Sequence, residues 1–195
     1  MSVSTTEQPG LLSTRRIVIA GVLGAIAIAL GVTRLGFIPV PNISGNATIM
    51  HIPAILGAVL EGPVVGVVAG GIFGFFSWTQ ADVPLFANPI IAIGPRLLIG
   101  LLAWLAYRSL LPVNKTLAAA IAGAVGTLTN TVGVIGLGIA FGLMTPEVIP
   151  LILPQAVLEV LIAMVLTPLV QRGIDLVRSG QTSAKETEPR DKMHY

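Results

Sequence analysis

The sequence predicts an all-α membrane protein, a compact bundle of six transmembrane helices with both termini in the cytoplasm. The 195 residues are 54% hydrophobic and only 10% charged, whereas soluble domains are about 25% charged. At about 20 apolar residues per spanning helix, this length allows about six spans. The chain has no cysteine, which excludes disulfides and thiolate metal sites. A net charge of +2 is too small to indicate binding to nucleic acid.

The first spanning helix is expected from Ile17 to about Val32. It follows a polar, Ser/Thr-rich segment, residues 1–14, which we expect to be disordered, and the basic pair Arg15-Arg16. A basic pair before an apolar run is also compatible with a signal peptide. The apolar run is long and no soluble domain is apparent after it, so a spanning helix is the better interpretation.

A loop and a tight helical hairpin are expected next. Residues 34–46 contain two prolines, two glycines and two asparagines, a composition typical of loops. The second helix is then predicted over 47–60 and the third over 63–78. Between them, Glu61-Gly62-Pro63 reads as a helix stop followed by a helix start.

Three further apolar segments complete the predicted bundle, which occupies residues 15–175. Loops separate them, and a charged tail without apolar periodicity, residues 176–195, is expected to be disordered. The helices are predicted over 89–107, 116–140 and 149–170, with loops over 79–88, 108–115 and 141–150.

The basic residues indicate the orientation of the bundle. Cytoplasmic loops of membrane proteins carry an excess of Lys and Arg, and six spans bring most basic positions to the side where both termini emerge. This side is therefore expected to be cytoplasmic, and the loops 34–46, 79–88 and 141–150 to face outward. The basic positions are Arg15, Arg16, Arg108, Lys115, Arg172 and Arg178.

Polar residues inside the predicted spans indicate a pocket near the outer side. Such residues are costly in lipid and are functional candidates by default. With a rise of about 1.5 Å per residue, polar residues of the fourth, fifth and sixth helices fall at one level, roughly 9–15 Å below the outer surface. The candidate substrate-binding residues are Arg96, Asn130, Gln155, Glu159, Trp78, His51 and Asn46.

Structural interpretations of the same residues remain open at this point. Arg96 and Glu159 can neutralise each other inside the bundle. Asn130 can hydrogen-bond between helices, and Trp78 can be an interfacial anchor. His51, beside a proline, can be a packing residue. Co-location at one depth, rather than any single residue, favours a pocket.

Several segments together are similar to one family of membrane proteins over about residues 15–175. They are the Ala-rich first helix, His51-Ile52-Pro53 to Gly57, Leu60-Glu61-Gly62-Pro63-Val64-Val65-Gly66, Pro95-Arg96-Leu97-Leu98-Ile99-Gly100, Leu128-Thr129-Asn130-Thr131, and Glu159. The chain resembles the substrate-binding membrane subunit, or S component, of energy-coupling factor (ECF) vitamin transporters.

The resemblance implies a six-helix solute binder in the bacterial plasma membrane, with a pocket closed by outer loops. It also implies two kinds of partner, a transmembrane coupling subunit and a pair of cytoplasmic ATPases. In this family, small residues at four-residue spacing on the first helix dock against the coupling subunit. The corresponding positions here are Ala25 and Ala29, with Gly21 at the neighbouring small position.

The motifs that would indicate an enzyme do not occur in the sequence. There is no Gly-x-x-x-x-Gly-Lys-Ser/Thr segment, so ATP-driven work must come from a partner. Neither His-Glu-x-x-His nor Gly-x-Ser-x-Gly occurs, and no cofactor is expected.

The expected function is the capture of a small water-soluble vitamin or precursor from outside. Arg96 suits a carboxylate or phosphate-like group, which makes pantothenate the first substrate expectation and riboflavin the second. Asn130, Gln155 and Glu159 suit hydroxyl or amide groups. The alternatives are a self-contained secondary transporter or channel, and a membrane scaffold without transport activity.

Overall fold

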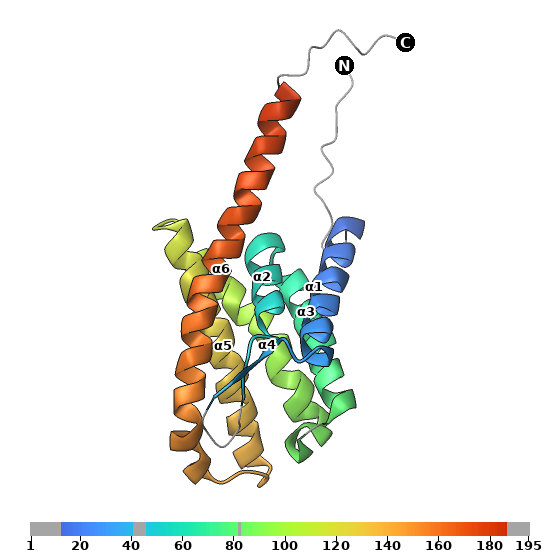
Figure 1. Cartoon of the computed structure of the whole chain (residues 1–195), viewed down its shortest axis with the longest axis vertical. Helices are drawn as coiled ribbons and strands as arrows, with labels where there is room; N and C mark the ends of the chain where they lie inside the picture. Colours follow the sequence, from blue (N-terminus) through green and yellow to red (C-terminus); the bar gives the residue numbers. More distant parts are fainter. Residues whose placement is uncertain (1–12, 41–45, 82, 187–195) are drawn as a thin grey trace.

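Six α-helices and one short β-hairpin form the part of the chain that the computed structural model describes, residues 13–40, 46–81 and 83–186, with side chains as far as residue 180. α1 begins and α6 ends at the same end of the bundle (Figure 1), which we call the terminal end; the opposite end, with η1 and η2, is the loop end. The elements are α1 (Thr14–Val32), β1 (Phe37–Pro39), β2 (Asn46–Thr48), α2 (Ile52–Glu61), α3 (Pro63–Gln80), the 3-10 turn η1 (Pro84–Ala87), α4 (Pro89–Leu110), α5 (Lys115–Ala140), the 3-10 turn η2 (Pro146–Val148) and α6 (Ile149–Glu186).

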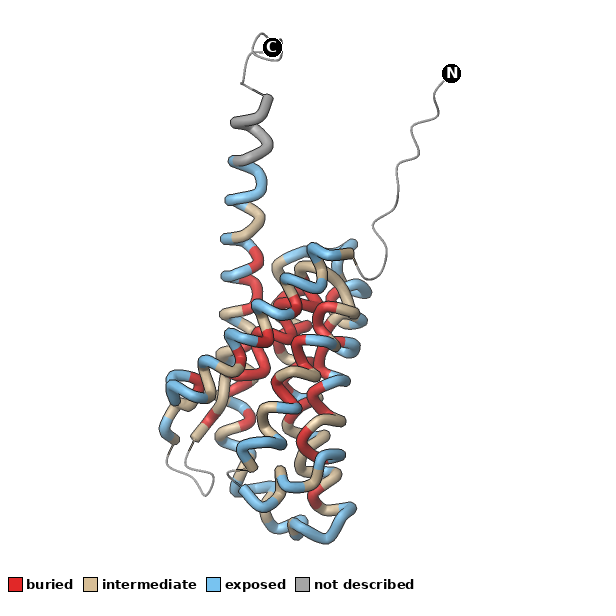
Figure 2. Tube along the Cα trace, turned by 90° about the vertical axis from the view of Figure 1, so that its right-hand side faces the viewer, coloured by how far each residue is buried: buried red, intermediate tan, exposed pale blue. Residues whose placement is uncertain are grey.

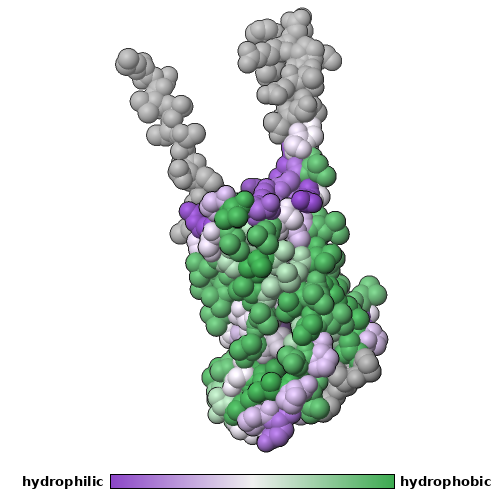
Figure 3. All heavy atoms as spheres, turned by 90° about the vertical axis from the view of Figure 1, so that its left-hand side faces the viewer, coloured by the Kyte–Doolittle hydropathy of each residue, from purple (hydrophilic) through white to green (hydrophobic). Residues whose placement is uncertain are grey.

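Five of the described helices are long and apolar enough to cross a membrane, and α2, with ten residues, is shorter. Large apolar side chains are exposed along the outside of the bundle, for example Val22, Leu105 and Leu161. Figure 3 shows hydrophobic residues over the middle of one face, with hydrophilic residues gathered toward both ends. The predicted all-helical membrane bundle is thus confirmed in its class, with five spans of full length.

The second pass differs from the prediction of a helix over 47–60. Its outer part is strand β2, in which Ala47 pairs with Ile38 of β1 in an antiparallel register. Helix α2 begins only at Ile52, with Pro53 in its first turn, a position that proline favours because its missing N–H is not needed there. Non-helical backbone at membrane depth is tolerated where it lines a cavity, and this hairpin does so.

The predicted corner between the second and third helices is confirmed. α2 ends at Glu61 and α3 begins at Pro63. Gly62 between them has φ +99°, a conformation that glycine adopts without the steric cost of a Cβ. The corner brings α3 back alongside α2 within a single residue.

Small residues allow the inner helices to approach closely. A Cβ on Gly100 of α4 would lie 2.2 Å from the carbonyl carbon of Gly66 in α3. Alanines of α2, α4 and α5, among them Ala54, Ala103 and Ala122, are fully buried in the main core cluster. Figure 2 shows the buried residues gathered along the inside of the bundle. Such backbone approach is how helices associate in lipid, where the hydrophobic effect between them is weak.

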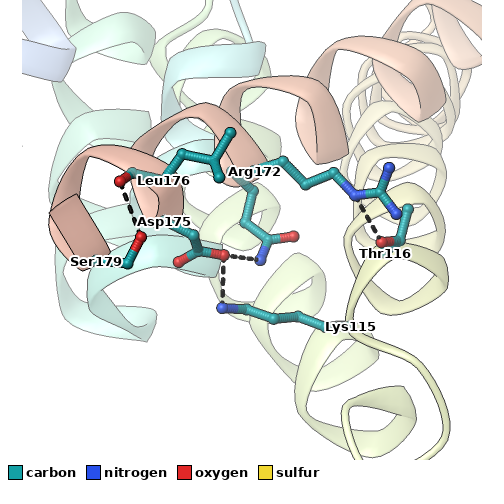
Figure 4. Close-up of polar contacts among 7 residues, drawn as sticks. Lys115, Thr116, Arg172, Asp175, Leu176 and Ser179 are labelled. Carbon is teal, nitrogen blue, oxygen red and sulfur yellow. Dashed lines mark hydrogen bonds and ion pairs between the residues drawn. The ribbon is translucent and has the colours of Figure 1, made fainter.

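Polar contacts at the terminal end hold α6 against the start of α5. The Lys115 Nζ and Gln171 Nε2 atoms both donate to Asp175 Oδ2, over 2.6 and 2.8 Å, and Arg172 Nε donates to Thr116 Oγ1 over 3.0 Å (Figure 4). α6 extends well past the predicted end of the sixth helix, through 176–186, residues that the sequence assigned to the tail. The contacts of Gln171, Arg172 and Asp175 hold the part of the helix just beyond its predicted end against α5. The remaining tail, 187–195, and residues 1–12 lie outside the described residues.

Glu61 joins three helices at the same end. Its Oε1 atom accepts from Arg15 Nη2 of α1 over 2.7 Å and from Arg178 Nη2 of α6 over 2.6 Å. The glutamate side chain is only 6% exposed, whereas the two arginines reach toward solvent. A charge that the sequence places in a corner thus connects the first helix to the last.

Candidate substrate-binding site

A cavity of about 740 Å³ lies toward the loop end of the bundle. Its volume falls within the range of small-molecule sites, roughly 300–1,000 Å³. Residues from α3, α4, α5, α6 and the hairpin line it, and each of the three loops predicted to face outward contributes. Lining residues include Arg34, Phe37, Asn46, Thr48, Met50, Phe73, Phe76, Gln80, Phe86, Arg96, Asn130, Met144, Gln155 and Glu159.

Arg96 owes its position to the proline before it. Pro95 has no N–H, so the carbonyl of Ile91, four residues earlier, loses its usual helical donor. The Arg96 Nη1 atom donates to that carbonyl over 2.8 Å. Gly70 of α3 and Gly133 of α5 pack against the two residues, since a Cβ on either would clash with Arg96 or Pro95. The guanidinium is therefore held by a hydrogen bond to its own helix, while both neighbouring helices pack closely against Pro95 and the Arg96 backbone.

The surroundings of Arg96 are aromatic rather than acidic. Its Cζ atom lies 4.6 Å from the ring centroid of Phe86 and 5.4 Å from that of Phe73. The residue is 3% exposed, and its Nε atom has no hydrogen-bond partner among the described residues. None of the ion pairs among these residues involves Arg96. A buried cation without a carboxylate is costly, so the cavity is suited to an anionic group at this point.

The alternative interpretation, in which Arg96 and Glu159 neutralise each other, does not appear as an ion pair among the described residues. Glu159 lies on α6, is 2% exposed, and accepts at Oε1 from Thr48 N over 2.6 Å and from Gln155 Nε2 over 3.0 Å. Its contacts thus run to the hairpin, to its own helix and to the Thr131 side chain of α5. Arg96 and Glu159 contribute to the cavity wall separately.

Asn130 and Asn46 also reach the cavity as expected. Asn130 is 6% exposed on α5, and its Oδ1 atom has no hydrogen-bond partner among the described residues. An amide oxygen in this state can accept from an N–H or O–H group. Asn46 begins β2 and lines the cavity from the hairpin.

His51 and Trp78 lie outside the cavity lining. His51 precedes α2 and is fully buried, with Nε2 2.8 Å from Thr127 Oγ1. The Thr127 hydroxyl donates to the Gly123 carbonyl, so Nε2 is the donor toward Thr127. Trp78 is 38% exposed and packs edge-on against Phe75, with ring centroids 5.7 Å apart. The structure brings neither residue to the cavity wall.

Several lining residues escaped the sequence argument. Phe73 of α3 and Phe86 of η1 flank Arg96. An apolar residue in a spanning helix or in a loop at its end carries no signal that separates a pocket wall from a lipid contact. Thr48 contributes its backbone N–H, which leaves no trace in residue type. Arg34, a lone cation in a predicted outer loop, was the available signal. It lines the cavity with its Cζ atom 5.4 Å from the Phe37 ring centroid.

The family of the chain follows from comparison with known proteins. Residues 15–171 match the family model described as "ECF transporter, substrate-specific component". The chain belongs to this family. It is therefore a non-enzymatic, multi-pass transport component of the cell membrane.

A curated relative of this S component has a named substrate. The pantothenate transporter PanT of Leuconostoc mesenteroides subsp. mesenteroides is 32% identical over 114 residues, which cover 52% of this chain and 56% of PanT. The matched region thus spans little more than half the length of that relative. The similarity of the S component to PanT is a basis for a substrate proposal.

Proposed function

We propose that this S component captures a small water-soluble vitamin or precursor from outside the cell, with pantothenate as the first candidate and riboflavin as the second. The observation that carries the proposal is Arg96, a buried guanidinium in a large cavity without a described carboxylate partner. A carboxylate on the ligand supplies the missing charge. The similarity to PanT supports pantothenate in particular.

Pantothenate also matches the other polar groups of the cavity. It carries a carboxylate, an amide N–H and hydroxyl groups. We assign the carboxylate to Arg96 and an N–H or O–H group to the Asn130 Oδ1 atom, with Gln155 and Asn46 as further polar contacts. Phe37, Phe76 and Met50 offer apolar contacts to the carbon skeleton. Riboflavin has no carboxylate and leaves Arg96 uncompensated, which places it second.

Titration calorimetry of the purified protein with a vitamin panel tests the proposal. Pantothenate is expected to bind, and panthenol, its uncharged alcohol analogue, to bind at least about 30-fold more weakly. The reason is that removing one partner of a buried hydrogen-bonded charge pair costs about 2–5 kcal/mol, and each 1.4 kcal/mol is tenfold in affinity. Equal binding of the two compounds contradicts the role of Arg96. Absence of any bound vitamin in a folded preparation contradicts the function.

We further propose how this subunit is oriented and where its partners bind. The basic side chains at the terminal end support a cytoplasmic position for that end, with the two ATPases beside it. Gly21, Ala25 and Ala29 lie on one face of α1 and are all exposed, whereas Ala20, Gly24 and Ala27 face the bundle. This small-residue face is the docking surface that we propose for the transmembrane coupling subunit. Cross-linking from a cysteine at position 25 tests the assignment.

A further inference from the structure

The Glu159 side chain lines the cavity, and one of its carboxylate oxygens accepts hydrogen bonds from two other parts of the protein. Oε1 accepts the backbone N–H of Thr48 over 2.6 Å and the side-chain amide of Gln155 over 3.0 Å. The first bond joins segments 111 positions apart in the chain. A charge-assisted bond of this kind is shorter and stronger than a neutral one.

Thr48 is the residue at which the hairpin meets α6. It ends β2 and is paired with Phe37 of β1 in an antiparallel register. The neighbouring Ile49 N–H donates to the Gly36 carbonyl over 2.9 Å, which secures the strand to its own partner. The Thr48 N–H points the other way, toward α6, so the Glu159 carboxylate secures the hairpin to the bundle.

The position of this hairpin decides the shape of the cavity. Phe37, Asn46 and Thr48 all line it. The hairpin occupies the part of the second pass where a spanning helix was expected, so strand β2 forms this part of the cavity wall in place of a helix. Movement of β2 away from α6 would open the wall of the cavity beside the ligand.

We propose that Glu159 is a positioning residue for substrate binding, which fastens the β1–β2 hairpin to α6 through the Thr48 N–H and thereby keeps the cavity wall closed against the ligand. Glu159 acts by positioning the hairpin, and its negative charge does not itself bind the substrate. The ligand readouts of this proposal rest on the proposed function. The readout on the Thr48 amide does not.

Two variants remove the bond from opposite sides. Glu159→Leu removes the acceptor. Thr48→Pro removes the donor and leaves the carboxylate in place, and this N–H is not part of the β1–β2 ladder, so proline costs no strand bond there. Either change is expected to speed pantothenate dissociation at least about tenfold with the association rate within threefold, since interface changes act mainly on dissociation. The double variant is expected to equal the worse single variant, because coupled groups are not additive.

Glu159→Gln is the conservative variant that separates positioning from charge recognition. Its amide oxygen still accepts from the Thr48 N–H, so it is expected to recover most of the loss seen with Glu159→Leu. If Glu159→Gln weakens binding as much as Glu159→Leu, the carboxylate contacts the substrate by its charge and the proposal is overturned.

Hydrogen exchange in the ligand-free protein gives a test that needs no ligand. The Thr48 amide is expected to exchange at least about tenfold faster in Glu159→Leu than in the wild type, and near the wild-type rate in Glu159→Gln. Unchanged exchange in a folded Glu159→Leu variant overturns the proposal. Should the wild type bind no vitamin, the proposed function fails while this measurement still decides the role of Glu159. Should Glu159→Leu not fold, Glu159→Ala removes the same acceptor and carries the same comparison of Thr48 amide exchange.

Discussion

Arg96 shows how a pair of adjacent residues builds a binding group. Pro95 releases the Ile91 carbonyl from helical bonding, and the Arg96 guanidinium takes up that carbonyl while Phe73 and Phe86 lie beside it. A planar guanidinium can donate to the carbonyl, contact the rings and still present N–H groups to a carboxylate. A lysine at this position supplies charge without that geometry.

Replacing Arg96 tests how much of the binding depends on its charge and how much on the planar geometry of the guanidinium. Arg96→Lys is expected to weaken pantothenate binding about tenfold and Arg96→Ala about 100-fold or more, because the first keeps the charge and the second removes it. Arg108→Ala is the matched control. Its guanidinium also lies over an aromatic ring, 5.6 Å from that of Trp104, but outside the cavity lining. Calorimetry should show unchanged affinity for this control; equal losses in all three variants contradict the site.

Among the helices, the close backbone approach of α3 and α4 positions the polar groups of the cavity. Gly66 and Gly100 meet between α3 and α4, one turn from Arg96, and Gly70 lies against the Arg96 carbonyl. In lipid, this contact depends on packing rather than on the hydrophobic effect. The spacing of α3 and α4 therefore determines both stability and the width of the cavity at Arg96.

A pair of glycine substitutions tests the contact between these elements. Gly100→Ala is expected to lower stability by about 1–3 kcal/mol, as overpacking does, and to weaken substrate binding by shifting α4. Gly136→Ala of α5 is the matched control, because a Cβ there meets nothing within 4 Å. It is expected to raise stability by up to about 1 kcal/mol through helix propensity. Thermal unfolding in detergent measures both, and similar melting temperatures for the two variants contradict the packing argument.

At the scale of the whole molecule, the two ends of the bundle have different roles. The loop end holds the cavity. The terminal end holds the ionic contacts, in which Glu61 connects α1 to α6 and Asp175 connects α6 to α5. The proposed function, in which a solute enters at one end and the energising partners bind near the other, agrees with this difference between the two ends.

Single cysteines test the orientation and the proposed docking face, because the natural chain has none. Ser179→Cys is expected to react with a membrane-impermeant maleimide only after the cells are opened, and Leu143→Cys in intact cells. Both positions are exposed. Ala25→Cys is expected to cross-link to the coupling subunit, whereas the buried Ala27→Cys is not. Reversed labelling contradicts the orientation, and equal cross-linking from positions 25 and 27 contradicts the docking face.

Local features of the sequence were enough to predict the class of the protein, most of the spans and the Gly62 corner. Apolar run length and rise per residue give how far along a helix a side chain lies, and the four residues placed at one level in this way, Arg96, Asn130, Gln155 and Glu159, all line one cavity. These quantities are local, and each can be counted along the chain.

Only the tertiary structure decided which of these groups face the cavity and what they contact. His51 and Trp78 contact Thr127 and Phe75 and do not line the cavity. The hairpin replaces the first part of the expected second helix. Glu159 accepts a hydrogen bond from Thr48 and forms no ion pair with Arg96. α6 also continues to Glu186. The direction in which a side chain points around its helix, and the course of a loop, depend on contacts between segments that are distant in the chain. The local pattern predicts how far along a helix a residue lies, whereas its contact partners depend on how the helices and loops pack.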